Sequence, residues 1–251
     1  MTTSIINCNK LMGDLFGYHD FEIALDTILL GSGIEQYRII RADLRLDSYD
    51  PEHYEAFQKL NRYLISAMAL AYPSVNCYRS TNLFSEKLLS IAIKNRDLEL
   101  ESYDKAAESG GRDLAMARLE ERSKARPDTS IDIPTEFLEH WRLRWQKAFS
   151  CLDAVQDRYN EELLARWQSG KNAYPCKWRS LTDFLLQNEQ SIFTRKQLID
   201  LLSRIPEVGP EKAKNRAENH KKRYGLEFFS KSDVQFAIDE IQRATEAFFA
   251  S

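Results

Sequence analysis

Hydrophobic and polar residues follow two different periods in the N-terminal third of the chain. Over residues 37–46 apolar and charged positions largely alternate, which is typical of a strand with one buried face. Over residues 51–71 apolar residues recur every three or four positions, which predicts a helix that Asp50 caps and Pro73 ends. Residues 75–80 form a second predicted strand. This order predicts a β-α-β unit in which the two strands pair in parallel.

From residue 83 onward the pattern has the 3.6-residue period of helices. We predict an amphipathic helix over 83–94, a charged helix over 97–124 that Gly110-Gly111 interrupts, and a long helix over 135–168. Shorter helices are predicted at 21–30, 181–187, 194–203, 211–224 and 231–249, the last with Ser230 and Asp233 as its capping box.

Large apolar residues recur along the predicted long helix at spacings of three, four and seven. We interpret this stripe as a core seam against neighbouring helices. The alternative is a row of aromatic rings that stack on nucleic-acid bases. The stripe consists of Trp141, Trp145, Phe149, Leu152, Tyr159, Leu163 and Trp167.

The predicted fold is mainly α, a helical bundle with a small α/β (β-α-β) element in the N-terminal third. We divide the chain into a small α/β region at 1–96, a long-helix region at 97–170 and a basic helical C-terminal region at 171–251. The chain has 251 residues, of which 43% are hydrophobic, and its mean hydropathy is −0.50. No apolar run reaches the length of a membrane span and no secretory signal is visible, so we expect a cytoplasmic protein that does not contact membranes.

The four cysteines lie too far apart in sequence for a zinc ribbon or a Cys-x-x-Cys redox site, both of which need closely spaced thiols. We therefore expect unpaired thiols in a reducing compartment. The histidines are equally scattered, and we predict neither a metal site nor a cofactor. The cysteines are Cys8, Cys77, Cys151 and Cys176.

Charge is distributed unevenly along the chain, whose formal net charge is −3. Residues 171–223 contain twelve Lys and Arg against six Asp and Glu, a local charge of +6 that leaves −9 for the rest. Such a basic segment on an acidic body is typical of a protein that contacts a polyanion. The alternative is a solvated helical surface with ordinary scatter of charge.

Two predicted helices of the basic segment are joined by Ile205-Pro206-Glu207-Val208-Gly209-Pro210. Pro206 ends the first helix, Gly209 permits a backbone conformation that a side chain disfavours, and Pro210 begins the second helix. The start of the second helix presents free N–H groups, which attract phosphate oxygens, and basic side chains follow within its first turns.

This hairpin resembles the helix-hairpin-helix motif of DNA repair and replication proteins, over about residues 195–224. Ile205, Pro206, Val208, Gly209, Pro210 and Ala213 all fall in the register of that motif, whereas Glu207 stands where the family has its first glycine. The resemblance implies contacts with nucleic-acid phosphates. The candidate binding residues are Pro206, Val208, Gly209, Lys212, Lys214, Arg216, Lys221, Lys222 and Arg223.

A second resemblance covers residues 205–237, which are similar to the small C-terminal domain of light-independent protochlorophyllide reductase subunits. The matching positions include Ile205, Pro206, Glu218 and Gly225. Nothing upstream supplies that family's cluster cysteines or nucleotide site, so this resemblance implies only a small helical module. A third interpretation is that Pro-x-x-Gly-Pro is a plain turn.

No phosphate-binding glycine loop, dinucleotide-binding fingerprint or serine nucleophile elbow occurs in the sequence, so we expect a binding protein rather than an enzyme. One polar site is conceivable on the first predicted strand, where Arg41, Asp43 and Arg45 share a face that Arg79 of the second strand could extend. Arginines on a sheet face can clamp a phosphate, but the same alternation is typical of the solvent face of any half-buried strand.

The sequence therefore favours a nucleic-acid-binding component of a larger nucleoprotein assembly, which contacts phosphates of DNA or RNA through its basic C-terminal helices. Its acidic and aromatic helical surfaces would then serve protein partners. The alternative is a non-catalytic protein–protein interaction or assembly factor in which the basic segment meets an acidic partner.

Overall fold

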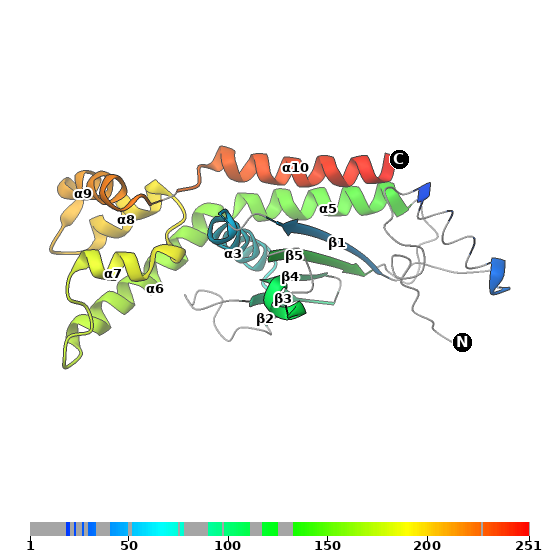
Figure 1. Ribbon diagram of the computed structural model, residues 1–251. Coiled ribbons are helices and arrows are strands. Elements are labelled where there is room, and N and C mark those ends of the chain that lie inside the picture. The colour runs from blue at the N-terminus through cyan, green and yellow to red at the C-terminus, as the bar shows by residue number, and fades with distance from the viewer. Residues whose placement is uncertain are drawn as a thin grey trace.

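The computed structural model describes residues 41–49, 52–74, 76–77, 90–96, 98–110, 117–124, 133–226 and 228–250, together with isolated positions between 19 and 33. The protein is mainly helical with one small sheet, as the sequence predicts (Figure 1). Its strands are β1 (Arg41–Ser48), β2 (Asn76–Cys77), β3 (Ser90–Lys94), β4 (Leu98–Asp104) and β5 (Ala117–Lys124). Its helices are α3 (Tyr54–Ala71), α4 (Lys105–Ser109), α5 (Ile133–Ser150), α6 (Leu152–Asn172), α7 (Leu181–Gln187), the short 3-10 turn Glu189–Ser191, α8 (Arg195–Arg204), α9 (Gly209–Tyr224) and α10 (Lys231–Ala250).

The five strands form an antiparallel sheet in the order β1-β5-β4-β3-β2. The prediction that residues 75–80 pair beside residues 37–46 is therefore wrong, because β1 and β2 occupy opposite edges and β1 pairs with β5. The two strands do run in the same direction, as a crossover through α3 requires, but three other strands lie between them. Alternation within one strand carries no information about its neighbour, and the neighbour of β1 follows about 70 residues later.

The predicted helices over 83–94 and 97–124 are also wrong in the described residues, which contain β3, β4, the short helix α4 and β5. On one face of the sheet, polar residues occupy every second position of β4 and β5 and lie opposite one another, for example Glu99 opposite Arg122 and Tyr103 opposite Arg118. The sequence alone does not show which residues lie opposite one another in a sheet. Without that information, the charged residues of these strands look like the solvent-exposed face of a helix. The predicted helix over 21–30 lies largely outside the described residues.

The predicted long helix is two helices, α5 and α6, which meet at Cys151. Its apolar stripe is nevertheless a core seam as predicted, because Trp141, Trp145 and Tyr159 are at most 3% exposed. These rings are therefore not available to stack on bases. The helices α7, α8 and α9 match their predicted ranges closely, and Ser230 and Asp233 form the expected capping box at α10.

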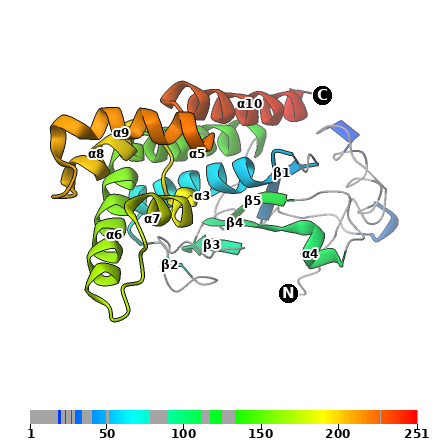
Figure 2. The ribbon, with the colours of Figure 1, turned by 60° about the vertical axis from the view of Figure 1, so that its left-hand side comes forward.

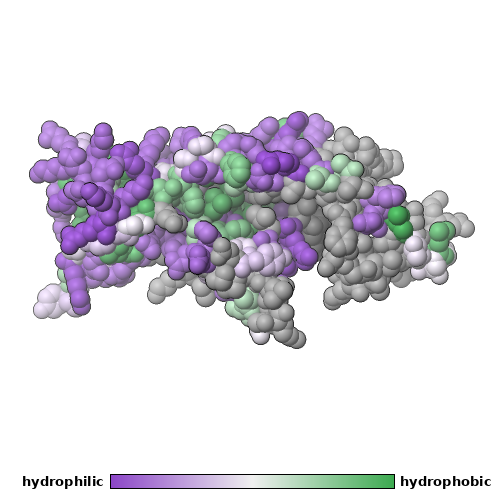
Figure 3. Space-filling view, turned by 45° about the horizontal axis from the view of Figure 1, so that its top comes forward, coloured by the Kyte–Doolittle hydropathy of each residue, from purple (hydrophilic) through white to green (hydrophobic). Residues whose placement is uncertain are grey.

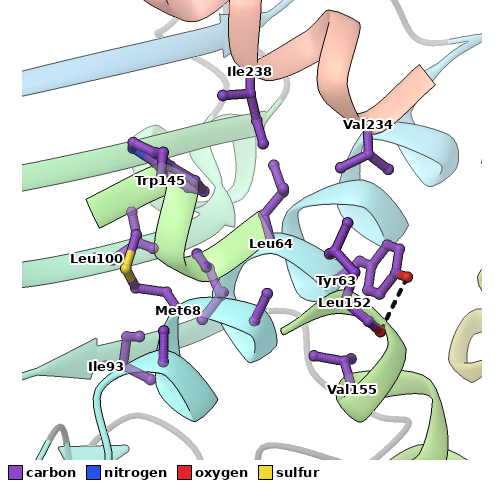
Figure 4. Close-up of a cluster of buried hydrophobic side chains, with 14 of the residues drawn as sticks. Tyr63, Leu64, Met68, Ile93, Leu100, Trp145, Leu152, Val155, Val234 and Ile238 are labelled. Carbon is purple, nitrogen blue, oxygen red and sulfur yellow. Dashed lines mark hydrogen bonds between the residues drawn. The ribbon is translucent and has the colours of Figure 1, made fainter. Parts of the chain in front are cut away.

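Two hydrophobic clusters hold the helices together, and α6 contributes to both. The first cluster lies between the inner face of the sheet, α3, α5, the first half of α6 and α10; Figure 4 shows Val234 and Ile238 of α10 pointing toward Leu64 of α3. The second joins the end of α6 to α7, α8 and α9. In Figures 1 and 2, α10 lies along α5 while α7–α9 gather at the opposite end of the described structure from the C-terminal end of α10. No helix in the described part of the chain is both long and apolar enough to span a membrane.

Candidate nucleic-acid interface

The hairpin between α8 and α9 is a compact turn of four residues that is anchored in the second hydrophobic cluster. Ile205 and Val208 are 0% and 5% exposed. The backbone N–H groups of Val208 and Gly209 both donate to the carbonyl oxygen of Ile205, at 2.9 and 3.1 Å. Val208, a candidate binding residue, therefore acts in packing, whereas Pro206 is exposed at the tip.

Gly209 has a φ of +69°, in the left-handed region that side chains disfavour. No atom lies close enough to exclude a Cβ at this position, so the requirement for glycine comes from the backbone alone. Pro210 follows in the first turn of α9, and the buried side chains of Ala213 and Ala217 face the second cluster. The conformational roles that the sequence assigned to Gly209 in the turn and to Pro210 at the start of the helix are confirmed.

The basic side chains of α9 divide between two faces of the helix. Lys212, Arg216 and Arg223 lie four and seven residues apart and so share one exposed face, which we call the basic face. Lys214, Lys221 and Lys222 lie outside this face, on the part of the helix surface that we call the mixed face because it also carries Glu211 and Glu218. The six cations thus form two surfaces of different character.

The two faces differ in how their cations are compensated. Every lysine of the mixed face has Glu211 or Glu218 three or four positions away in α9, the spacing at which helical side chains attract each other. No residue of the basic face has an acidic residue at that spacing within α9, and Lys212 and Arg216 form no ion pair with any residue that the structure describes. This difference is readable from the sequence once the helix boundaries are known.

Other cations of the basic segment are already engaged. Arg195 pairs with Glu218, and Arg204 pairs with Asp157 and Asp200 at 3.2 and 2.6 Å. In Figure 3 the end of the molecule that α7–α9 form is mostly hydrophilic on the face shown. No lysine of the mixed face forms an ion pair with a described residue either, so the two faces differ only in the acidic residues that lie three or four positions away along α9.

Glu207, which departs from the hairpin family's pattern, forms an ion pair with Lys171 at the end of α6. Its partner therefore comes from a different helix and is neither Arg204 nor Lys212, the cations nearest to it in sequence. The hydrogen bond from Lys171 lowers the pKa of the Glu207 carboxyl. Since no described residue other than glycine has a positive φ, the backbone at position 207 does not require glycine.

His220 lies on the buried side of α9 and is 6% exposed. Its ring is 4.8 Å from that of Tyr224. Burial lowers the pKa of His220, which favours the neutral imidazole. His220 therefore adds no charge to the surface of α9 at neutral pH.

The conceivable polar site on β1 is part of a larger charged face of the sheet. Asp43 lies opposite Arg122 and Arg45 lies opposite Glu120, while Arg45 is exposed. Arg79 lies outside the described residues, and β2, which precedes it, is at the far edge of the sheet from β1. The structure therefore does not extend the β1 face with the second strand.

The arginines that the sequence analysis missed on this face come from β5. Arg118 donates two hydrogen bonds to Asp47, at 2.6 and 2.8 Å, and these raise the pKa of its guanidinium. Arg122 contacts three carboxylates, those of Glu99, Glu101 and Glu120, at 2.5, 3.2 and 2.8 Å. Arginines so fully paired with carboxylates are poor candidates for a phosphate clamp.

Among the described residues no group of three or more His, Cys, Asp or Glu is placed to hold a metal ion. Cys151 and Cys176 are free thiols. Neither a family model, nor a curated protein, nor a solved structure matches this chain. The case for a function therefore depends on the hairpin and on the charges around it.

Proposed function

We propose that this protein is a nucleic-acid-binding component of a larger nucleoprotein assembly and that it contacts phosphates through α8 and α9. The observation that carries the proposal is the basic face of α9, whose exposed cations lack acidic neighbours on their own helix. A cation that is already paired must break that pair before it can bind a phosphate, whereas these cations are available.

The hairpin adds a second attraction for phosphate beside the basic face. The first turn of any helix leaves N–H groups without intrahelical acceptors, and the helix dipole places partial positive charge there. Lys212 lies in this first turn of α9, where it follows Gly209, Pro210 and Glu211. Phosphate contacts of this kind carry no base identity, so we expect binding that is salt-dependent and largely independent of sequence.

The alternative function, an interaction or assembly factor, is favoured by apolar side chains on the other half of the molecule. Phe236 of α10 and Leu143 of α5 are 63% and 50% exposed, and these two helices lie side by side (Figure 1). Exposed apolar residues on neighbouring helices are typical of surfaces that contact proteins. Purified protein that lacks salt-removable absorbance at 260 nm would favour this alternative.

The proposal is tested by two triple variants of equal charge on the same helix. The first replaces the basic face (Lys212→Gln, Arg216→Gln and Arg223→Gln), and the second replaces three lysines of the mixed face (Lys214→Gln, Lys221→Gln and Lys222→Gln). Glutamine is a good helix former, so α9 is preserved in both. Binding to a fluorescent duplex of mixed sequence is measured by anisotropy over a series of salt concentrations.

We expect the basic-face variant to reduce the slope of log affinity against log salt by up to about 0.9 for each phosphate that the variant no longer neutralises. The mixed-face variant should change the slope much less, because its lysines neighbour carboxylates. Equal effects of the two variants would show that only net charge matters. Unchanged binding in the basic-face variant, or no binding by the original protein, would overturn the proposal.

A further inference from the structure

The loop between α6 and α7, residues 173–180, presents an aromatic ring to solvent at the same end of the molecule as the hairpin. Tyr174 is 102% exposed, more than any other large apolar or aromatic side chain among the described residues. The loop lies at the free end of α6, below α7 in the view of Figure 1. The ring of Tyr174 therefore contributes nothing to the packing of the described chain.

The base of this loop, by contrast, is firmly anchored. Trp178 is 7% exposed, and its indole nitrogen donates to the carbonyl oxygen of Arg166 at 3.1 Å. Its ring lies so close to the backbone of Gly170 that a Cβ there would come within 1.9 Å of the indole nitrogen. The N–H of Lys177 donates to the carbonyl oxygen of Gly170 at 2.9 Å, which closes the loop. A fixed base thus holds an exposed aromatic tip.

Cations flank the exposed ring on both sides in sequence. The ammonium group of Lys177 lies 4.6 Å from the centre of the Trp178 ring, which holds it near the loop, and Arg179 is exposed. On the other side Lys171 pairs with Glu207, so the end of α6 contacts the hairpin. Tyr174 follows Lys171 by three positions, which keeps their Cα atoms within about 11 Å.

We propose that Tyr174 stacks on an unpaired base of a single-stranded nucleic acid, while Lys177 and Arg179 contact the neighbouring phosphates. Proteins that bind single strands combine cations along the backbone with aromatic rings on which bases stack, and a ring that protrudes from an anchored loop can reach a base only where it is not already stacked in a duplex. This inference rests on the proposed function, since it adds a second contact for the same ligand beside the hairpin.

The test compares Tyr174→Ala with Tyr174→Phe, which keeps the aromatic face and removes only the hydroxyl. Affinities of the full chain are measured by anisotropy for a labelled single-stranded DNA, a single-stranded RNA of the same sequence and the corresponding DNA duplex. Thermal melting serves as the folding control, and we expect no change in either variant because the side chain is fully exposed. The basic-face variant of α9 is measured on the same three ligands.

We expect Tyr174→Ala to weaken binding to one or both single strands roughly 5- to 100-fold, the range that removal of one stacked base produces. Binding to the duplex should change by less than about twofold, and Tyr174→Phe should bind like the original protein. A larger effect on the RNA or on the DNA identifies which strand is the ligand.

Several results would overturn the inference. One is that Tyr174→Ala loses affinity equally for the duplex and for the single strands. Another is that Tyr174→Phe loses as much affinity as Tyr174→Ala, and a third is that Tyr174→Ala binds single strands as tightly as the original protein. If Tyr174→Ala has no effect while the basic-face variant weakens binding, this inference fails and the proposed function stands. If the original protein binds none of the three ligands, both fail.

Discussion

Both the charged face of the sheet and the surface of α9 are rich in Lys, Arg, Asp and Glu, but their charges are arranged in opposite ways. On the sheet, Arg118 and Arg122 are 10% and 18% exposed and contact carboxylates from three strands. On α9, Lys212 and Arg216 point to solvent without an acidic neighbour on their helix. A high density of charge therefore marks a structural network in one region and a candidate binding surface in the other. The two regions differ in whether each cation has a carboxylate close to it.

The largest expected effect comes from breaking the network on the sheet. Arg122→Ala leaves Glu99, Glu101 and Glu120 close together without the cation between them. Removal of one partner from a largely buried ion pair is strongly destabilising, and we expect the free energy of unfolding to fall by about 3 kcal/mol. Urea denaturation measures this change.

The matched control for Arg122→Ala is Arg158→Ala on α6. Arg158 pairs with Glu161 at 3.3 Å, but both side chains are more than 60% exposed. We expect its removal to cost less than about 0.5 kcal/mol. Similar costs for the two variants would mean that the sheet network is no more important to stability than a surface pair.

A smaller effect is expected from Tyr103→Phe at the margin of the same network. The hydroxyl of Tyr103 donates to Glu120 at 3.2 Å, so we expect its removal to cost about 1 kcal/mol at neutral pH. Burial, followed by the charge of Glu120, raises the pKa of Tyr103 to about 12 from 10.0.

The raised pKa of Tyr103 predicts how this cost depends on pH. Between pH 10 and 12 the unfolded phenol loses its proton while the folded one retains it, so the original protein loses stability as the pH rises through this range. The phenylalanine variant lacks this titration, and the difference in stability between the two proteins should narrow. Denaturation at pH 7, 10 and 12 measures the difference, and a constant value would contradict the prediction.

The smallest effect concerns Glu207, the acidic residue at the tip of the hairpin that precedes the basic face. Glu207→Gly removes a negative charge and releases Lys171 from its ion pair, so we expect severalfold tighter binding to nucleic acid. The backbone at this position does not need glycine, which adds freedom to the unfolded chain, and the melting temperature should fall by about 2 °C.

Glu207→Gln separates the two consequences of that change. Glutamine removes the charge but does not add the backbone freedom that glycine gives to the unfolded chain. Binding should therefore tighten as in Glu207→Gly, while the melting temperature should fall less than in Glu207→Gly. Unchanged binding in both variants, together with lower melting temperatures, would favour the hairpin as a packing turn.

The C-terminal helices could be predicted from the sequence because their limits depend on local signals. Thr194 and Ser180 accept hydrogen bonds from backbone N–H groups at the starts of α8 and α7, and Gly209 and Gly225 adopt the positive φ that begins or ends a helix. Each of these signals acts within about four residues. The same helix limits also predict which basic residues of α9 share a face. To distinguish the two faces, the positions of Glu211 and Glu218 must be considered together with those of the lysines and arginines.

The sequence by itself determined the mainly helical class, the buried aromatic seam and the hairpin between α8 and α9, because caps, turns and 3.6-residue periodicity act locally. Only the tertiary structure decided that residues 98–104 and 117–124 are strands, that β1 pairs with β5, and that Glu207 meets Lys171. These outcomes depend on partners that are distant in the chain. In the sequence, a charged residue that pairs with an opposite charge on a neighbouring strand looks the same as a charged residue on a solvated helix. Only the folded structure shows which of the two it is.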